Sequence, residues 1–381
     1  MKALINARIL TPQGFKDRQS VIFQKGIVVT VCDDGVRPLD AVVERDLEGL
    51  NLLPGFVDVQ VNGGGGVLFN DEPSVEGIRA IGKAHRQYGT TGFFPTLISD
   101  DFDVMKRAIS AVSEAISLGV PGVLGIHLEG PFLNAQKRGV HNASKFLTLG
   151  DREVDVVSSL DNGKTIITLA PEKTTPDIIQ ALVTHGLIVS AGHTQATYED
   201  TLLAMDAGLT GFTHLFNAMC PLNSREPGII AAALQDKRAW CGIIADGHHV
   251  HPAMLRLAVN AKQDDQIFLV TDAMPCVGAR NKSFELGGVK IAVTDGKCVT
   301  AKGTLAGSDL DMIGAVRNAV EFLKIDLAQA VRMASTVPAH FAGLQDKAGE
   351  IRAGLQADFV LLSDEQEVKT TWIKGQCIDH F

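Results

Sequence analysis

Polar residues that can bind a metal or move a proton follow several apolar, strand-like segments of this chain, at the point where each segment ends. They are His127 and Glu129, His193 in the run Ser190–His193, His214 in Phe212–His214, and Asp272 in Leu269–Asp272. Burying an ionised carboxylate such as Glu129 costs on the order of several kcal/mol unless a cation or a proton compensates it. The pattern therefore predicts a metal site, provided that the fold brings these strand ends together.

Glu129, His193 and His214 provide one carboxylate and two imidazoles. Such a set suits zinc with an open position for water, and iron(II) accepts similar ligands. A metal of this kind lowers the pKa of bound water from roughly 15.7 toward about 7, so that hydroxide is available at neutral pH. Asp272 is then better placed as the group that takes the proton of the water and later delivers it to a leaving amine. The plain alternative for Asp272 is a helix N-cap or a salt bridge.

Three loops after the expected strands hold further polar clusters. They are Lys137–Asn142, His214–Met219 followed by Arg225–Gly228, and Asp246–His251. A loop rich in histidine can be a metal site, but imidazoles together with Arg225 are better suited to an anion such as phosphate. Solvent exposure is the simpler interpretation for His248 and His251. Gly303–Ser308, before a helix expected from Leu310, resembles an amide-lined turn that could contact a ligand.

Strand-like and helical segments alternate about eight times in the middle of the chain, which is typical of an α/β protein with a (β/α)₈ TIM barrel. The expected strands are Gly55–Val61, Gly92–Leu97, Val123–Leu128, Thr165–Leu169, Leu187–Ala191, Gly211–Thr213, Trp240–Ile244 and Ile267–Val270. The helical stretches include Val75–Tyr88, Phe102–Leu118 and Thr175–His185. In such a barrel, chemistry collects at the C-terminal strand ends, where these polar residues stand.

A doubly wound open sheet is the competing fold. It normally has a glycine-rich phosphate turn after its first strand, and Asn62–Gly66 follows the first expected strand here. That run lacks the GxGxxG spacing and leads into no immediate helix. We expect it instead to let the backbone pass close to a bulky group.

The two ends of the chain have strand composition and too few residues to form a core alone. The expected strands are Ala3–Ile9, Val21–Phe23, Ile27–Val31, Asp46–Leu52, Asp358–Leu362 and Val368–Ile373. We therefore expect residues 1–53 and 350–381 to form one small β-sandwich domain, with residues 54–349 inserted as the barrel.

Composition excludes several classes of protein. A net charge of −9 without a cluster of lysine or arginine argues against a nucleic-acid partner. The six scattered cysteines include no CxxC pair and are expected to be buried thiols in a reducing compartment. The N-terminus lacks the features of a signal peptide, and no apolar run approaches membrane-spanning length. These observations favour a cytoplasmic protein without a membrane or nucleic-acid partner.

Several motifs together resemble one known family. In order they are PGFVDVQVNG, GIHLEGPFLN with KRGVHN, SAGHT, THLFNAM followed by REPG, GIIADGHHV, LVTDAM and GTLAGS. They resemble the N-acetylglucosamine-6-phosphate deacetylases of the amidohydrolase superfamily over nearly the whole chain. The resemblance implies a homodimer of metal-bearing barrels that hydrolyses the acetamide of the sugar phosphate to glucosamine 6-phosphate and acetate, in amino-sugar catabolism and cell-wall recycling.

The resemblance also implies a role for each matching residue. Glu129, His193 and His214 would bind the metal. Asp272 would act as general base and then as general acid, while His141 would polarise the acetamide carbonyl and hold the substrate. Phosphate and sugar would be held by Asn217, the Ala218 amide, Arg225 from the partner subunit, and His249. The remaining pocket lining would be Val140, Asp246, Gly247, His248, Leu305, Ala306 and Gly307.

One departure from the wider superfamily concerns the number of metals. Binuclear members carry His-x-His on the first strand, whereas this chain has Gln60 and Asn62. Amides are poorer zinc ligands than imidazoles, so we predict one firmly held divalent metal per subunit, zinc or alternatively iron(II), with at most a weak second position at Gln60 and Asn62. The alternatives are deacetylation of another N-acyl amino-sugar phosphate, such as N-acetylgalactosamine 6-phosphate, or a non-catalytic sensor of amino-sugar phosphates.

Overall fold

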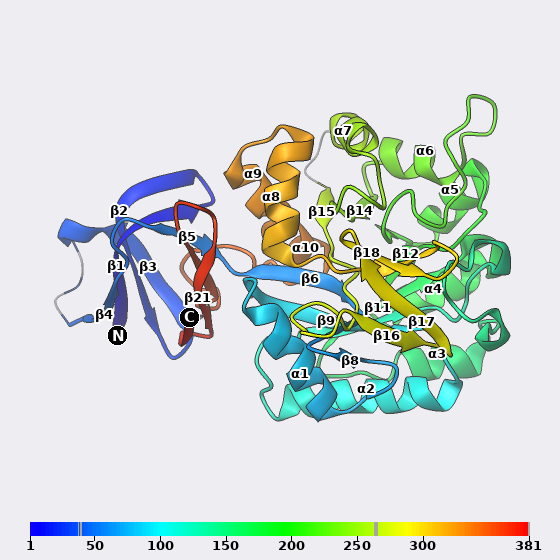
Figure 1. Ribbon diagram of the computed structural model, residues 1–381, viewed down its shortest axis with the longest axis horizontal. Helices are drawn as coiled ribbons and strands as arrows, with labels where there is room; N and C mark the ends of the chain where they lie inside the picture. The colour runs from blue at the N-terminus through cyan, green and yellow to red at the C-terminus, as the bar shows by residue number, and fades with distance from the viewer. Residues whose placement is uncertain (37, 39, 263–265, 380–381) are drawn as a thin grey trace.

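A computed structural model describes residues 1–36, 38, 40–262 and 266–379, and it contains a large barrel with a small β domain beside it (Figure 1). The barrel strands are parallel and pair in the order β15-β14-β13-β12-β11-β10-β9-β6. Their bounds are β6 (Phe56–Val61), β9 (Thr90–Ile98), β10 (Gly125–Glu129), β11 (Lys164–Leu169), β12 (Ile188–Ala191), β13 (Gly211–Phe212), β14 (Trp240–Ile243) and β15 (Ile267–Leu269). Val61 bridges Ala273 in parallel, which joins the last strand to the first. The predicted (β/α)₈ barrel is confirmed.

Helices follow the barrel strands in alternation. They are α1 (Val75–Arg86), α2 (Phe102–Ser117), α3 (Asp151–Val157), α4 (Pro176–Thr184), α5 (Tyr198–Asp206), α6 (Gly228–Gln235), α7 (Pro252–Ala261), α8 (Met312–Leu323), α9 (Leu327–Ala334) and α10 (Thr336–Phe341). Local signals fix where some of them begin: the side chains of Ser74, Thr175 and Asp311 accept backbone N–H groups in the first turns of α1, α4 and α8. The expected ends of the barrel strands and of the three helices differ from the observed ends by at most two residues.

Strands from both ends of the chain share one mixed sheet, in the order β22-β21-β20-β5-β1-β2-β3, with β4 paired to β1. Their bounds are β1 (Lys2–Thr11), β2 (Gly14–Gln24), β3 (Ile27–Asp33), β4 (Val42–Asp46), β5 (Asn51–Pro54), β20 (Phe359–Leu362), β21 (Val368–Ile373) and β22 (Gln376–Asp379). Antiparallel pairing of β5 with β20 joins the two ends, and Phe23, Phe359 and Trp372 are buried in the common core. On this pairing we propose the domain boundaries given above, 1–53 with 350–381 and 54–349.

The single strand expected at Asp46–Leu52 is wrong. Glu48 and Gly49 have φ angles of 56° and 82°, in the left-handed region that ends an extended segment. The backbone therefore turns there, and it divides the segment between β4 and β5.

A four-stranded antiparallel sheet was not predicted. It consists of β16 (Ser283–Leu286), β17 (Val289–Thr294), β18 (Lys297–Thr300) and β19 (Leu305–Ser308), inserted between β15 and α8. A parallel bridge between Ala273 and Ser308 attaches it to the barrel, and its buried residues Ile291 and Ala306 pack with Met274. The turn expected at Gly303–Ser308 is thus largely a strand, and the following helix begins at Met312 rather than Leu310.

The glycine run after the first barrel strand forms a small hairpin of β7 (Gly63–Gly64) and β8 (Val67–Leu68). A Cβ atom on Gly64 would lie 2.8 Å from Nε2 of His85, and one on Gly63 would lie 2.4 Å from the carbonyl oxygen of Val67. The run therefore does let the backbone pass close to a bulky side chain, as expected from the sequence. Among the described residues, no helix combines the length and the apolar character needed to cross a membrane.

Candidate metal centre and active site

Three barrel strands end at the residues that were expected to bind a metal. Glu129 is the last residue of β10, and His193 and His214 each lie two residues beyond the ends of β12 and β13. Both histidines have left-handed backbones, with φ angles of 49° and 34°. Non-glycine residues rarely adopt this conformation, and where they do they cluster at functional sites. All three side chains are buried.

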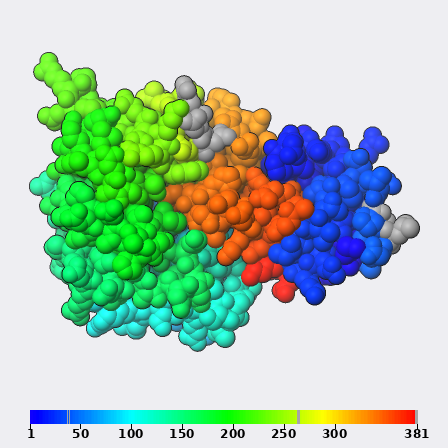
Figure 2. Space-filling model, turned by 180° about the vertical axis from the view of Figure 1, so that it is seen from behind, coloured from blue at the N-terminus to red at the C-terminus, as the bar shows by residue number. Residues whose placement is uncertain are grey.

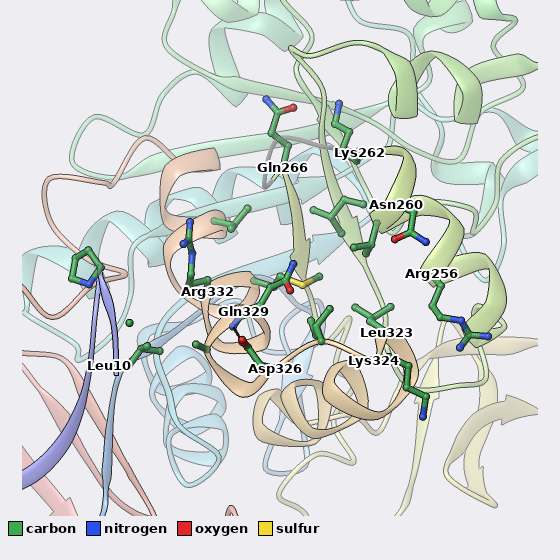
Figure 3. A pocket seen from close by; sticks show the side chains of 18 of the residues that line it. Leu10, Arg256, Asn260, Lys262, Gln266, Leu323, Lys324, Asp326, Gln329 and Arg332 are labelled. Carbon is green, nitrogen blue, oxygen red and sulfur yellow. Dashed lines mark hydrogen bonds between the residues drawn. The ribbon is translucent and has the colours of Figure 1, made fainter. Parts of the chain in front are cut away.

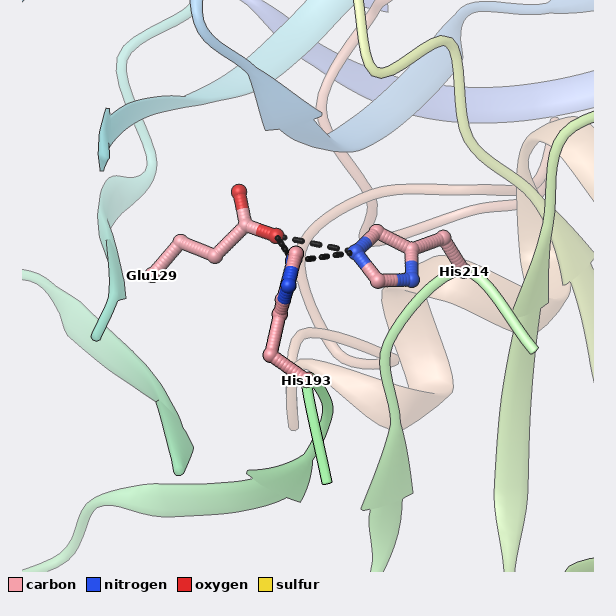
Figure 4. Close-up of side chains that lie close together, drawn as sticks. All are labelled: Glu129, His193 and His214. Carbon is pink, nitrogen blue, oxygen red and sulfur yellow. Dashed lines mark hydrogen bonds and ion pairs between the residues drawn. The ribbon is translucent and has the colours of Figure 1, made fainter. Parts of the chain in front are cut away.

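The donor atoms of these residues converge on one point (Figure 4). Oε1 of Glu129 lies 3.2 Å from Nε2 of His193 and 3.0 Å from Nε2 of His214. The two Nε2 atoms are 3.1 Å apart. Ligands on a tetrahedral zinc ion at the usual bond lengths are about 3.3 Å apart, so the observed triangle has the size that such an ion requires.

The chemistry of the donors also fits a divalent cation. Nδ1 of His193 lies 2.8 Å from the carbonyl oxygen of Lys137, which can only accept, so Nδ1 carries the proton and Nε2 offers its lone pair. Within the described part of the chain, Nδ1 of His214 is buried without a hydrogen-bond partner. Burial alone would raise the pKa of Glu129, but the adjacent imidazoles of His193 and His214 outweigh it and hold this pKa well below its usual value. The carboxylate is therefore ionised, as a metal ligand must be.

Asp272 lies three residues beyond the end of β15, and it too has a left-handed backbone, with φ of 50°. Its Oδ1 accepts hydrogen bonds from Nδ2 of Asn62 at 2.6 Å and from Nε2 of Gln60 at 3.2 Å. Burial, followed by the nearby charge of Glu129, raises the pKa of Asp272 to about 6. Both amides thus direct their nitrogens at this carboxylate, which fixes its orientation and leaves it a base near neutral pH.

His141 lies in the loop after β10, with its ring centroid 4.4 Å from that of His193. Its Nδ1 lies 3.4 Å from the backbone nitrogen of Ser99, which can only donate, and 2.8 Å from Oγ of Ser99. Nδ1 is therefore the acceptor, and the proton of the neutral ring resides on Nε2. Burial, followed by the proximity of His193, lowers the pKa of His141 to about 3, so the ring is neutral. It can offer an uncharged N–H donor to a ligand.

These side chains surround a cavity of about 200 Å³. The predicted site residues that line it are Asn62, Glu129, Val140, His141, His193, His214, Asn217, Ala218, His249, Asp272, Leu305 and Gly307. Ile98, Gly139, Met274 and Thr304 also line it; Gly139 and Thr304 belong to the predicted runs Lys137–Asn142 and Gly303–Ser308, whereas Ile98 and Met274 were not predicted as lining. Ile98 ends the second barrel strand, so its position was a usable signal, but its apolar type gave no indication of chemistry.

Several predicted pocket residues lie outside this cavity. Asp246 instead supports His249, because its Oδ2 lies 2.6 Å from Nδ1 of His249. Ala306 is fully buried in the core under the four-stranded sheet. His248 is exposed, and so is Arg225, on the loop before α6 that projects from the barrel (Figures 1 and 2). Gly247 and Gln60 likewise do not border the cavity.

A larger hollow of about 750 Å³ lies elsewhere (Figure 3). Its lining includes Leu10, Arg256, Gln329 and Ile267, which is the first residue of β15. It therefore lies at the N-terminal end of β15, whereas Asp272 lies beyond the C-terminal end of that strand. Because active sites of this fold lie at the C-terminal strand ends, the smaller cavity is the candidate active site.

The chain is similar to known proteins over most of its length. The family model described as "Amidohydrolase family" matches residues 51–378. An N-acetylgalactosamine-6-phosphate deacetylase of a Shewanella species is 46% identical over 328 residues, with 86% of this chain and 83% of the relative covered. The N-acetylglucosamine-6-phosphate deacetylase of Haemophilus influenzae is 34% identical, with 98% of each chain covered.

Solved structures are similar over the full length. The N-acetylglucosamine-6-phosphate deacetylase of Pasteurella multocida superposes with a TM-score of 0.95 at 33% identity, with 100% of both chains covered. A mutant of the Mycobacterium smegmatis enzyme in complex with N-acetyl-D-glucosamine-6-phosphate has a TM-score of 0.91 at 31% identity, with 100% of this chain and 99% of that chain covered.

Proposed function

The chain belongs to the amidohydrolase family, and from that premise we propose that it is an N-acetylglucosamine-6-phosphate deacetylase. It hydrolyses the acetamide of N-acetyl-D-glucosamine 6-phosphate to D-glucosamine 6-phosphate and acetate. The observation that carries the proposal is the buried triangle of Glu129, His193 and His214, with Asp272 lining the same cavity.

The first part of the mechanism concerns the metal. Glu129, His193 and His214 would hold one divalent cation, zinc in preference to iron(II). Such a cation would supply Lewis-acid chemistry to the water and to the amide carbonyl. Gln60 and Asn62 are engaged with Asp272, so they offer at most a weak second position.

The proton transfers belong to Asp272. Its carboxylate accepts a proton from the attacking water and then delivers it to the nitrogen of the leaving amine. The amide donors of Gln60 and Asn62 hold Oδ1, which orients the carboxylate toward the cavity. A pKa raised to about 6 by burial makes Asp272 a stronger base than an exposed aspartate and leaves it largely ionised at neutral pH.

His141 stabilises the charge that develops on the acetamide oxygen. Its neutral ring carries the proton on Nε2, since Nδ1 accepts from the backbone of Ser99. A neutral donor gains strength as the carbonyl oxygen becomes negative, and a preorganised donor costs no reorganisation at that moment. We assign His141 to this oxyanion contact.

Asn217, the Ala218 amide and His249 bind the sugar and its phosphate from the loops after β13 and β14. The hydrogen bond to Asp246 fixes the ring of His249 in place. Arg225, exposed in this chain, binds the phosphate of the partner's substrate in a homodimer, which accounts for its position outside the cavity. We propose that the enzyme works in the cytoplasm.

The direct test is release of acetate by the purified protein from N-acetylglucosamine 6-phosphate, compared with unphosphorylated N-acetylglucosamine. Turnover should be far faster with the phosphate, and equal turnover would contradict the proposed phosphate contacts. No acetate from either compound would refute the function.

A second substrate is supported by the Shewanella relative, whose name gives N-acetylgalactosamine 6-phosphate. The two sugar phosphates differ only in configuration at C4, away from the acetamide at which the bond breaks. The same measurement with both epimers ranks them by kcat/KM. A higher value for the galactosamine compound would reassign the substrate and leave the mechanism unchanged.

A further inference from the structure

A continuous row of polar side chains lies inside the barrel below the metal ligands. Nδ1 of His127 lies 2.9 Å from the carbonyl oxygen of Val59, and Nε2 lies 2.7 Å from Oγ1 of Thr168. Oγ1 of Thr168 is 2.7 Å from Oγ1 of Thr213, which is in turn 2.7 Å from Oγ of Ser190. The four side chains are buried. We name His127, Thr168, Thr213 and Ser190 the interior row.

The direction of these hydrogen bonds follows from the carbonyl at one end. A carbonyl only accepts, so His127 donates from Nδ1, and the Nε2 of a neutral ring then accepts from Thr168. Having used its proton, Thr168 accepts from Thr213, and Thr213 accepts from Ser190. Each hydroxyl proton is used once, so removal of one member leaves a neighbouring group unpaired in the interior.

The row links the three strands that carry the metal ligands. His127 precedes Glu129 by two residues on β10, Ser190 precedes His193 by three, and Thr213 immediately precedes His214. Thr168 lies on β11, which pairs with both β10 and β12 and carries no ligand itself. Thr168 therefore connects the strand that carries Glu129 to the segments that carry His193 and His214.

We propose that Thr168 is a positioning residue, which holds Glu129 in register with His193 and His214 before the metal binds. The inference rests on the metal site of the proposed function. A metal site whose donors are already in place loses less conformational freedom on binding than one that must assemble. Loss of the Thr168 hydroxyl should then weaken metal binding more than it weakens the fold.

Substitution Thr168→Val tests this with little change in shape. The methyl group of Thr168 packs under Gly192, where a Cβ atom would lie 2.7 Å from it, and valine keeps that methyl. Thr168→Ser keeps the hydroxyl. The matched control is Thr96→Val. Thr96 is equally buried on β9 and lies opposite His127 in the strand pairing, but its hydroxyl bonds the backbone of Val61 and Phe94 and no member of the row.

The measurement is competition for Zn²⁺ between metal-free protein and a chromophoric chelator, with urea unfolding of each metal-free variant alongside. We expect Thr168→Val to raise the Kd for Zn²⁺ by about tenfold or more, as substitutions next to metal ligands typically do. Thr168→Ser and Thr96→Val should stay within about threefold of the wild type, although Thr96→Val loses stability.

Three results would overturn the inference, and they differ in what else they reject. An unchanged Kd in Thr168→Val, or an equal rise in Thr96→Val, would reject the positioning role and leave the deacetylase intact. Failure of the unmodified protein to bind Zn²⁺ or Fe²⁺ would reject the proposed function as well.

Discussion

Oγ of Ser99 lies 2.8 Å from Nδ1 of His141, and the backbone nitrogen of Ser99 approaches the same atom at 3.4 Å. Both groups are buried, and both approach the Nδ1 atom of His141. They hold the tautomer in which Nε2 carries the proton. If His141 contacts the acetamide as proposed, Ser99 acts on that group through His141, although Ser99 does not itself line the cavity.

This relationship predicts that the effects of the two residues are not additive. His141→Ala removes the oxyanion donor and should lower kcat by on the order of a hundredfold. Ser99→Ala should lower kcat by about tenfold, since the backbone donor remains but the closer hydroxyl is lost. In the double variant, loss of Ser99 should cost nothing further, because its action requires the imidazole. Independent, multiplying effects on kcat would show that Ser99 does not act through His141.

Asp272→Asn should reduce kcat by a hundredfold or more, on the order of the contribution of a general acid-base group. The asparagine can still accept at Oδ1 from Asn62, so the fold should persist and far-UV circular dichroism should match that of the wild type. Single-turnover acetate release measures the effect. A rate within a few-fold of the wild type would assign the proton transfers to another group.

The proposed contribution of Arg225 from a partner subunit can be tested by mixing two inactive variants. In a dimer of Arg225→Ala with Asp272→Asn, one site combines an intact Asp272 with the intact Arg225 of the other chain. Subunit exchange at equal concentrations should restore about a quarter of the wild-type activity, since half of the dimers are mixed and each has one complete site. No recovery, with exchange verified by mass spectrometry of tagged chains, would place Arg225 outside the site.

Stability should fall at high pH because of Asp358, just before β20. Its Oδ1 accepts the backbone N–H of Lys374 at 2.6 Å, and burial raises the pKa of this carboxyl from 3.8 to about 7. Between these values the folded state binds more protons than the unfolded state, so the free energy of unfolding decreases as pH rises through about 7.

Asp358→Asn keeps the acceptor and removes the titration. The variant should be more stable than the wild type at pH 8 by on the order of 2 to 4 kcal/mol, and this gain should shrink toward pH 5. Urea unfolding at both pH values provides the comparison, with the exposed Asp346→Asn as control. An equal gain at pH 5 and pH 8 would show that charge at Asp358 is not the cause.

The barrel was predictable because its strands are buried on both faces and appear in the sequence as short apolar runs. Strands β6, β10 and β11 are fully or almost fully buried, and polar residues appear at the ends of β6 and β10. Three unrelated strand ends carrying Glu129, His193 and His214 then indicated a common site, since parallel strands bring their C-terminal ends together. The roles of these residues in binding and catalysis stay a prediction.

The four-stranded sheet was not predictable by the same reasoning. Most residues of β16 to β18 are partly or fully exposed, so hydrophobic alternation is weak there. Because this sheet was not predicted, Ala306 was expected to line the pocket. Alternate residues of a strand face opposite sides, so Leu305 and Gly307 of β19 border the cavity while Ala306 points into the core. Ser99 was missed because a serine after an apolar strand gives no chemical signal by itself. Its importance appears only when the structure places its hydroxyl beside His141.

The central claim is that one divalent cation, held by Glu129, His193 and His214, is required for deacetylation. Metal-free protein prepared with a chelator should be titrated with Zn²⁺ and, under anaerobic conditions, with Fe²⁺, while bound metal and acetate release from N-acetylglucosamine 6-phosphate are measured together. Activity should be absent without metal and should reach its maximum at one ion per chain. Full turnover in verified metal-free protein would contradict the claim, and so would a maximum that required two ions per chain.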